Sequence, residues 1–245
     1  MRDPRINLAL RMGDNTLILA QQNSKWCGHA PTLEEDIALS NISLDLMGHA
    51  QMWLGLAAEI EGQGRNADTL AFFRDTDEFR NSLLVERPNC DFAITLMRQY
   101  LFDVWHLDQL SLLSESSDSS VSEISQKAVI EVRYHRERSK NLVTKLGDGT
   151  AESHNRMQEA LNALWSYFGN LFEDSDSDNL LSELTPHAQD WSDDYGKLAP
   201  MLRKQPDMAI GMRLFHAMHL TDNRNGARKG SVMDLIYDVS DWKSL

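Results

Sequence analysis

Apolar residues recur along most of this chain at intervals of three and four, the spacing that places them on one face of an α-helix. Prolines, glycines and short polar runs separate the periodic segments. The pattern predicts long helices over residues 6–22, 32–60, 91–113, 120–146 and 150–172, a shorter one over 68–84, and further helices over 179–195 and 201–221. Because no stretch alternates polar and apolar residues as a half-buried strand does, we predict an all-α fold.

Two of the predicted helices have a capping signal in the sequence at their start. Thr32 is followed three residues later by Glu35, and Ser120 by Glu123, which are capping-box pairs. The segment 32–60 is apolar on nearly every side, a pattern typical of a helix enclosed by others. We therefore expect this helix to be central and buried.

Four acidic residues provide one carboxylate for each of four long helices. Asp14, Asp45, Asp103 and Glu131 are separated by 31, 58 and 28 residues. A short, a long and a short interval fit a four-helix bundle made of two antiparallel hairpins joined by a long crossover. In such bundles, carboxylates at these positions hold a pair of metal ions. The spacing therefore predicts the frame of a di-metal site.

The histidines that complete such sites are missing from their usual places. Two helices of a di-metal bundle carry a histidine three residues after the acid. Here the third residue after Asp45 is Gly48, and the third after Glu131 is Tyr134. The chain thus has the frame of a di-iron site that has lost its histidines, and we expect no catalytic residue and no bound metal. The residues of this vestigial site are Asp14, Asp45, Gly48, Asp103, Glu131 and Tyr134.

Histidines at shifted positions leave an alternative open. His49 and His135 come four residues after an acid, and His106 comes three residues after Asp103. Residues three or four apart lie near one helix face, so a rearranged metal site is geometrically possible. Its ligands would be drawn from Asp14, Asp45, His49, Asp103, His106, Glu131 and His135. A histidine shifted by one position points away from the site that its carboxylate faces, so we expect His49 and His135 to lie on the outer face of the bundle or behind the metal ligands, where a residue supports the site without binding the metal.

Buried carboxylates need a metal, a cation or a proton, because an isolated charge in an apolar interior is very costly. Without a metal, we expect Arg11, Arg133 or a bound proton to neutralise the four acids.

Composition and charge narrow the range of partners and locations. The net charge of −13 disfavours nucleic acid and anionic membrane surfaces. Residues 1–7 are charged and polar rather than a signal sequence, and no stretch approaches ~18 apolar residues. Cys27 and Cys90 form neither a disulfide framework nor a zinc-ligand pattern. We expect a cytoplasmic protein with one helical domain over 1–245, made of a core bundle over about 6–146 and extra helices over about 150–245.

Several ordered strings of residues resemble one known family. They lie at 11–15, 26–31, 41–48, 68–72, 83–89 and 127–135. Together they are similar to the PaaC family, the non-catalytic ferritin-like subunits of the bacterial phenylacetyl-CoA epoxidase complex, a ring-1,2-phenylacetyl-CoA monooxygenase. The likeness extends over roughly residues 8–172. The basic turn at 225–230 also fits, but the His-Thr-Glu-His-Leu string that follows it in the family is replaced here by residues 231–235.

The resemblance implies a ferritin-like bundle and a role in aerobic phenylacetate degradation. The family's catalytic subunit holds the di-iron centre and epoxidises the ring of phenylacetyl-CoA with O2, using electrons from a separate reductase. A chain of this kind would bind and stabilise that catalytic subunit within a hetero-oligomer, and we also expect a homodimer contact.

Two other functions remain open from the residues alone. One is an active di-iron oxygenase or oxidase with the shifted ligands His49, His106 and His135. The other is a helical scaffold with no link to oxygenation.

Overall fold

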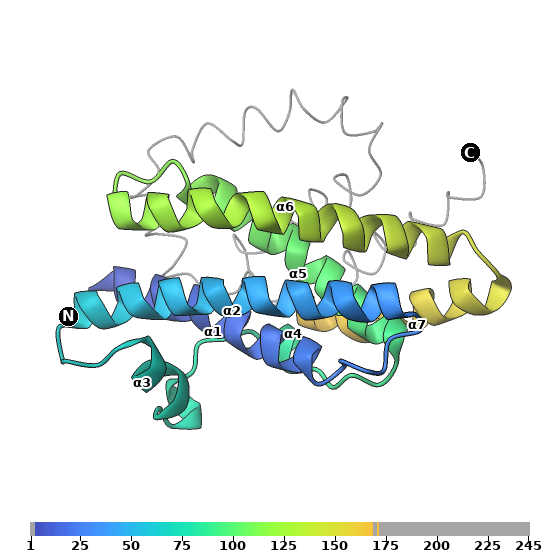
Figure 1. The fold of residues 1–245 in the computed structure, drawn as a ribbon, viewed down its shortest axis with the longest axis horizontal. Helices are drawn as coiled ribbons and strands as arrows, with labels where there is room; N and C mark the ends of the chain where they lie inside the picture. The colour runs from blue at the N-terminus through green and yellow to red at the C-terminus, as the bar shows by residue number, and fades with distance from the viewer. Residues whose placement is uncertain (1–2, 169–170, 172–245) are drawn as a thin grey trace, which may run out of the picture. The chain divides into compact units, whose positions relative to one another are not determined.

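The computed structural model describes residues 3–168 and residue 171, which belong to one compact unit. This part of the chain is helical and contains no β-strand (Figure 1). Its elements are α1 (Pro4–Ser24), α2 (Leu33–Glu61), α3 (Ala67–Phe72), the 3-10 turn η1 (Thr76–Glu78), α4 (Leu83–Glu86), α5 (Phe92–Leu113), α6 (Ser119–Gly147) and α7 (Ala151–Phe168). The predicted all-α, ferritin-like bundle is confirmed. No described helix is both long and apolar enough to span a bilayer.

Two helical hairpins build the bundle. Helix α1 packs along α2, and α5 packs along α6, while the segment from α3 to α4 crosses between the hairpins (Figure 1). Helices α2 and α6 meet along a looser seam, and α7 packs on α5 and α6. The short–long–short spacing of the four acids therefore predicted the connectivity correctly. The helices expected over 179–195 and 201–221, and the C-terminal part of the predicted single domain, lie outside the described residues.

Helix starts follow side-chain capping. The Thr32 hydroxyl accepts the backbone N–H of Glu35, and the Asp91 carboxylate accepts that of Ile94 at 2.8 Å. The start of α6 differs from the prediction, because Asp118 rather than Ser120 caps it. The Asp118 carboxylate accepts two backbone N–H groups of the first turn, and its negative charge is favourable at a helix N-terminus.

The predicted helix over 68–84 is wrong as a single element. The chain leaves α3 after Phe72, makes the turn η1, and regains helical form only at Leu83. Just beyond the end of α3, the side chain of Arg74 turns inward to Asp14 and is buried there.

The prediction that α2 is enclosed is also wrong. Four of its large apolar side chains, Leu33, Ile37, Leu44 and Met47, are 71%, 52%, 69% and 43% exposed. Only the opposite side of α2, which includes Leu46 and Trp53, is fully buried in the bundle. Packing in the core of the bundle therefore does not explain why the outer side of α2 is apolar.

A glycine sets the close packing of the first hairpin. A Cβ placed on Gly13 of α1 would lie 2.8 Å from the side chain of Leu54 in α2 and 3.3 Å from its backbone nitrogen. Such a contact requires the two helices to move apart. Gly48, in α2, has no neighbouring atom within 4 Å of a Cβ placed on it.

These two glycines predict opposite effects of the same substitution. Gly13→Ala should lower the free energy of unfolding by about 1–3 kcal/mol, because it overpacks a tight helix contact. Gly48→Ala should raise it by about 0.5–1 kcal/mol, because alanine favours the helix and meets no obstacle. Urea unfolding of both variants checks this, and equal effects would contradict the close approach at Gly13.

Candidate functional site

Asp14, the acid of α1, is paired with an arginine from the crossover. Both side chains are buried, and the two terminal nitrogens of Arg74 bind the two carboxylate oxygens, one of them at 3.0 Å. The backbone N–H of Arg80 donates to Asp14 at 2.8 Å. Burial raises the pKa of the Asp14 carboxyl, and the hydrogen bonds and charge of Arg74 act against that rise. The counter-charge is thus Arg74, and neither Arg11 nor Arg133 as expected.

Asp103, the acid of α5, lies in a chain of neutral polar groups. The Asn23 amide donates to Gln99 at 2.6 Å, and the Gln99 amide donates to Asp103 at 2.6 Å. The other carboxyl oxygen is hydrogen-bonded to the Ser139 hydroxyl at 2.8 Å. All four side chains are buried. This chain of hydrogen bonds connects α1, α5 and α6 through the interior.

Burial raises the pKa of Asp103 to about 8, despite the opposing hydrogen bonds of Ser139 and Gln99. Asp103 therefore carries a proton at neutral pH. A protonated carboxyl can donate to the Ser139 oxygen, and the Ser139 hydroxyl lies 3.2 Å from the carbonyl of Arg136. The expectation that a proton neutralises one of the acids agrees with this geometry.

The acids of α2 and α6 each bind the histidine of the other helix. His135 Nε2 lies 2.9 Å from Asp45, and His49 Nε2 lies 2.7 Å from Glu131. The histidines are buried, whereas the carboxylates are 38% and 48% exposed. The crossed pairing follows from antiparallel packing, because residue numbers increase along α2 in the direction in which they decrease along α6. These two hydrogen bonds hold the seam between the hairpins together.

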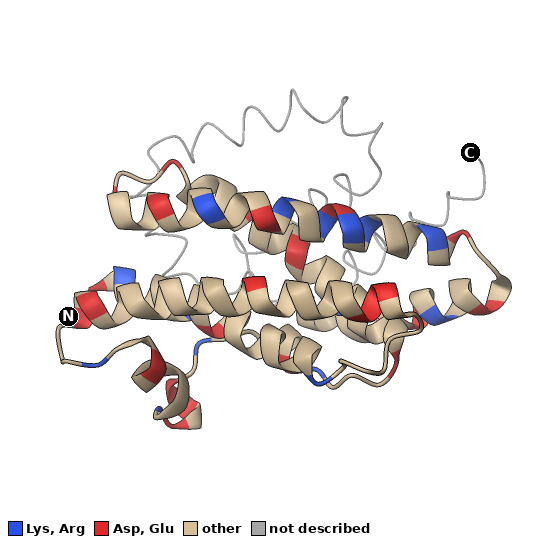
Figure 2. Cartoon of the chain, viewed as in Figure 1, with Lys and Arg blue, Asp and Glu red and all other residues tan. Residues whose placement is uncertain are grey.

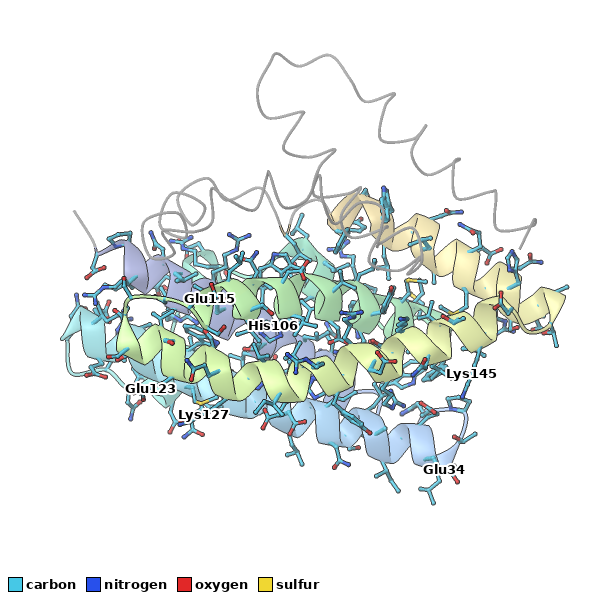
Figure 3. The ribbon with its side chains drawn as sticks, turned by 90° about the horizontal axis from the view of Figure 1, so that it is seen from above. Glu34, His106, Glu115, Glu123, Lys127 and Lys145 are labelled. Carbon is cyan, nitrogen blue, oxygen red and sulfur yellow. The ribbon has the colours of Figure 1, made fainter. Side chains whose placement is uncertain are left out.

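His106 of α5 lies beside this seam and is fully buried (Figure 3). Its ring centroid is 5.7 Å from that of His49 and 5.0 Å from that of Phe102. Within the described part of the chain, neither ring nitrogen of His106 has a hydrogen-bond partner, and the same holds for Nδ1 of His49 and His135. Three imidazoles from three helices thus share one interior region.

These imidazoles are neutral at physiological pH. Burial lowers the pKa of His49 and His135, and their carboxylate partners offset only part of that effect. The pKa of His106 lies well below its usual value, mainly because the ring is buried and to a lesser extent because of the neighbouring His49 and His135. Because Nε2 of His49 and of His135 faces a carboxylate, that nitrogen carries the proton and Nδ1 is bare.

The structure corrects the predicted directions of acids and histidines. The row of core positions on α2 runs through Leu46, His49 and Trp53, so His49 faces inward and Asp45 lies toward the rim. On α6, His135 likewise takes the core position. The outer-face position expected for His49 and His135 is therefore wrong, because these histidines, and not their acids, continue the apolar helical spacing and lie inside. That spacing was readable in the sequence.

The vestigial set does not converge on one point. Tyr134 is 64% exposed, and Gly48 lies at the half-exposed surface of α2. Asp14 and Asp103 belong to two separate networks. The shifted set converges in part, since His49, His106 and His135 share the interior with Asp45 and Glu131 at its rim. The sequence analysis missed Arg74, Gln99 and Ser139, which bind the acids from other elements or from another turn of the helix.

The side chains present do not fit the di-iron centre of such bundles. A di-iron site requires carboxylates from all four helices on one pair of ions. Here Arg74 occupies both oxygens of Asp14, and neutral donors occupy those of Asp103. Across residues 3–168, no three His, Cys, Asp or Glu side chains are placed to hold one metal ion.

Comparison with known proteins identifies the family. A family model described as phenylacetic acid catabolic protein matches residues 1–192. The chain belongs to this family. It is 49% identical over 174 residues to a protein of Escherichia coli (strain K12) that is named as one of the subunits of 1,2-phenylacetyl-CoA epoxidase, and the match covers 71% of this chain and 70% of that protein. The resemblance recognised in the sequence is therefore confirmed.

The Arg74–Asp14 pair predicts a large and specific loss of stability. Arg74→Met should lower the free energy of unfolding by about 3–5 kcal/mol, because it leaves a buried carboxylate without a counter-charge. Adding Asp14→Asn should restore part of the loss by removing that charge. Arg80→Ala is the control, since the Arg80 side chain makes no hydrogen bond to Asp14 and only its backbone N–H does. Equal losses in Arg74→Met and Arg80→Ala, measured by denaturant unfolding, would contradict the pairing.

Asp103 predicts a pH dependence of stability. Its pKa of about 8 in the folded state exceeds the ordinary value of 3.8, so the folded chain holds an extra proton between these limits and loses stability as pH rises through them. Asp103→Asn should abolish that loss, which is on the order of 4–5 kcal/mol between pH 4 and pH 8. Glu123→Gln, at an exposed site on α6, is the control. Denaturant unfolding at pH 4 and pH 8 measures this difference. If Asp103→Asn loses as much free energy of unfolding between the two pH values as the unchanged chain does, the assignment is refuted.

Proposed function

We propose that this chain is a structural, non-catalytic subunit of a multicomponent di-iron monooxygenase that epoxidises phenylacetyl-CoA in aerobic phenylacetate degradation. In that role it binds and stabilises the catalytic subunit, which holds the iron. The setting is the cytoplasm. Support for the pathway comes from the family and from the E. coli relative, which is named as a subunit of the epoxidase.

The Arg74–Asp14 ion pair supports the non-catalytic part of the proposal. A carboxylate that ligates iron must present at least one free oxygen to the metal. In this chain a buried guanidinium binds both oxygens of Asp14. An arginine in that place supplies the positive charge that metal ions supply in a catalytic bundle. It therefore lets the bundle keep Asp14 in its interior without iron.

One observation favours the alternative of an active oxygenase with shifted ligands. The imidazoles of His49, His106 and His135 share the interior and have ring nitrogens without partners among the described residues. In metal sites, ligating histidines commonly donate their other ring nitrogen to a carboxylate, as His49 and His135 do here. The scaffold without a link to oxygenation has no comparable support, because the family is one of phenylacetate catabolism.

Co-expression with the catalytic subunit distinguishes the two functions. We expect iron to fractionate with the catalytic subunit, and epoxidation of phenylacetyl-CoA to require both chains. Glu131→Gln keeps an oxygen that can accept from His49 but removes the charge, so it should leave the iron content and the turnover of the complex within about twofold. Glu137→Gln, exposed on the same helix, is the control. About two irons per chain in this protein purified alone, or loss of iron and turnover in Glu131→Gln, would establish the alternative.

A further inference from the structure

Four imidazole nitrogens in the interior of the bundle have no hydrogen-bond partner among the described residues. They are Nδ1 of His49, Nδ1 of His135 and both ring nitrogens of His106, and all three side chains are fully buried. Buried polar groups in folded proteins are almost always hydrogen-bonded to protein or to ordered water, because an unpaired group loses its bonds to solvent without replacement. These nitrogens therefore require a partner.

The four nitrogens come from three helices that meet in one region. His49 lies on α2, His106 on α5 (Figure 3) and His135 on α6. The rings of His49 and His106 meet edge to face with their centroids 5.7 Å apart, and His135 is close enough to affect the pKa of His106 as well. Two hydrogen bonds to one shared atom span about 5–6 Å. Rings at this separation are therefore within reach of one small bridging molecule.

The donors and acceptors of the three rings define the ligand. Nε2 of His49 and of His135 donates to a carboxylate, which leaves Nδ1 of both rings as an acceptor. The neutral ring of His106 offers one N–H donor and one acceptor. A ligand that fits must therefore donate two hydrogen bonds and accept one. Water does so, and buried waters typically make about three hydrogen bonds.

Charged ligands fit these rings less well. An anion would face the lone pairs on Nδ1 of His49 and of His135. A metal ion needs converging ligands, and no three His, Cys, Asp or Glu side chains in the described part of the chain are placed to hold one. Between Asp36 and Glu59, the only charged residue of α2 is Asp45 (Figure 2), and it is already bound by His135. The site therefore favours a neutral ligand.

We propose that one internal water molecule binds between α2, α5 and α6. It donates to Nδ1 of His49 and to Nδ1 of His135, and it accepts the N–H of His106. This inference rests on the non-catalytic function proposed above, because a metal ion at these nitrogens would take the place of the water.

The water joins both hairpins in the interior. The bonds of His49 and His135 to carboxylates already connect α2 with α6 at the rim of the seam. The water adds α5 to this network through His106. It uses the nitrogens that the tautomers of His49 and His135 leave bare, so the carboxylates at the rim and the water in the interior depend on the same two rings.

A high-resolution crystal structure of the full-length chain tests the site directly. We expect a water oxygen about 2.7–3.2 Å from Nδ1 of His49, from Nδ1 of His135 and from one nitrogen of His106, without anomalous scattering from a metal. A direct N–H···N contact between two of the rings, or carbon atoms packed against the nitrogens, would overturn the water alone. A metal ion bound to these nitrogens would overturn both the water and the non-catalytic function.

Oxygen-17 magnetic relaxation dispersion, which counts long-lived internal waters, tests the same site in solution. His106→Phe removes the N–H and fills the place of the ring, so it should lower the count by one. His106→Gln keeps a donor and an acceptor and should retain the water. His154→Phe, at an exposed site on α7, is the matched control and should leave the count unchanged.

The same count in His106→Phe as in the unchanged chain would contradict the proposal. Thermal unfolding checks that each variant is folded. If His106→Phe does not fold, the crystal structure of the unchanged chain decides.

Discussion

The pairing of Arg74 with Asp14 is the constraint on which the rest of the bundle depends. A carboxylate inside an apolar bundle requires a counter-charge, and Arg74 provides it from a segment 60 residues further along the chain. The crossover leaves helical form after Phe72, and Arg74 enters the bundle from there. The same contact joins the crossover to the first hairpin and occupies both oxygens of the acid.

The other three acids of the frame need no buried counter-charge. Asp103 holds a proton and lies among amides and hydroxyls. The three buried histidines are neutral, and the two acids that bind His49 and His135 remain near solvent at the rim of the seam. A bundle with the frame of a di-metal site can therefore keep its four acids, because each has a partner or a proton in place of the metal's charge. This balance is compatible with a subunit whose task is to fold reliably and to bind other chains.

The surface of α2 connects the fold to assembly. A helix that is apolar on most sides looks like a core element, yet the bundle encloses only one side of α2. The remaining stripe, together with the absence of basic residues on α2 and their excess on α6, has the composition of a contact surface. The hydrophobicity of α2 therefore exceeds what burial within the described part of one chain accounts for.

Sequence alone determined the helical class, the order of the long helices, the two-hairpin connectivity and the family, because apolar periodicity and the spacing of four acids are properties of the chain itself. The core row of apolar spacing also runs through His49 and His135, but the prediction followed the acids and did not place these histidines in the core. Only the tertiary structure decided which group neutralises each acid. Arg74 and Ser139 reach Asp14 and Asp103 from elements remote in sequence, and no local pattern encodes such contacts. The break at Arg74 and the exposed side of α2 have the same origin, since burial depends on what packs against a helix and not on its own residues.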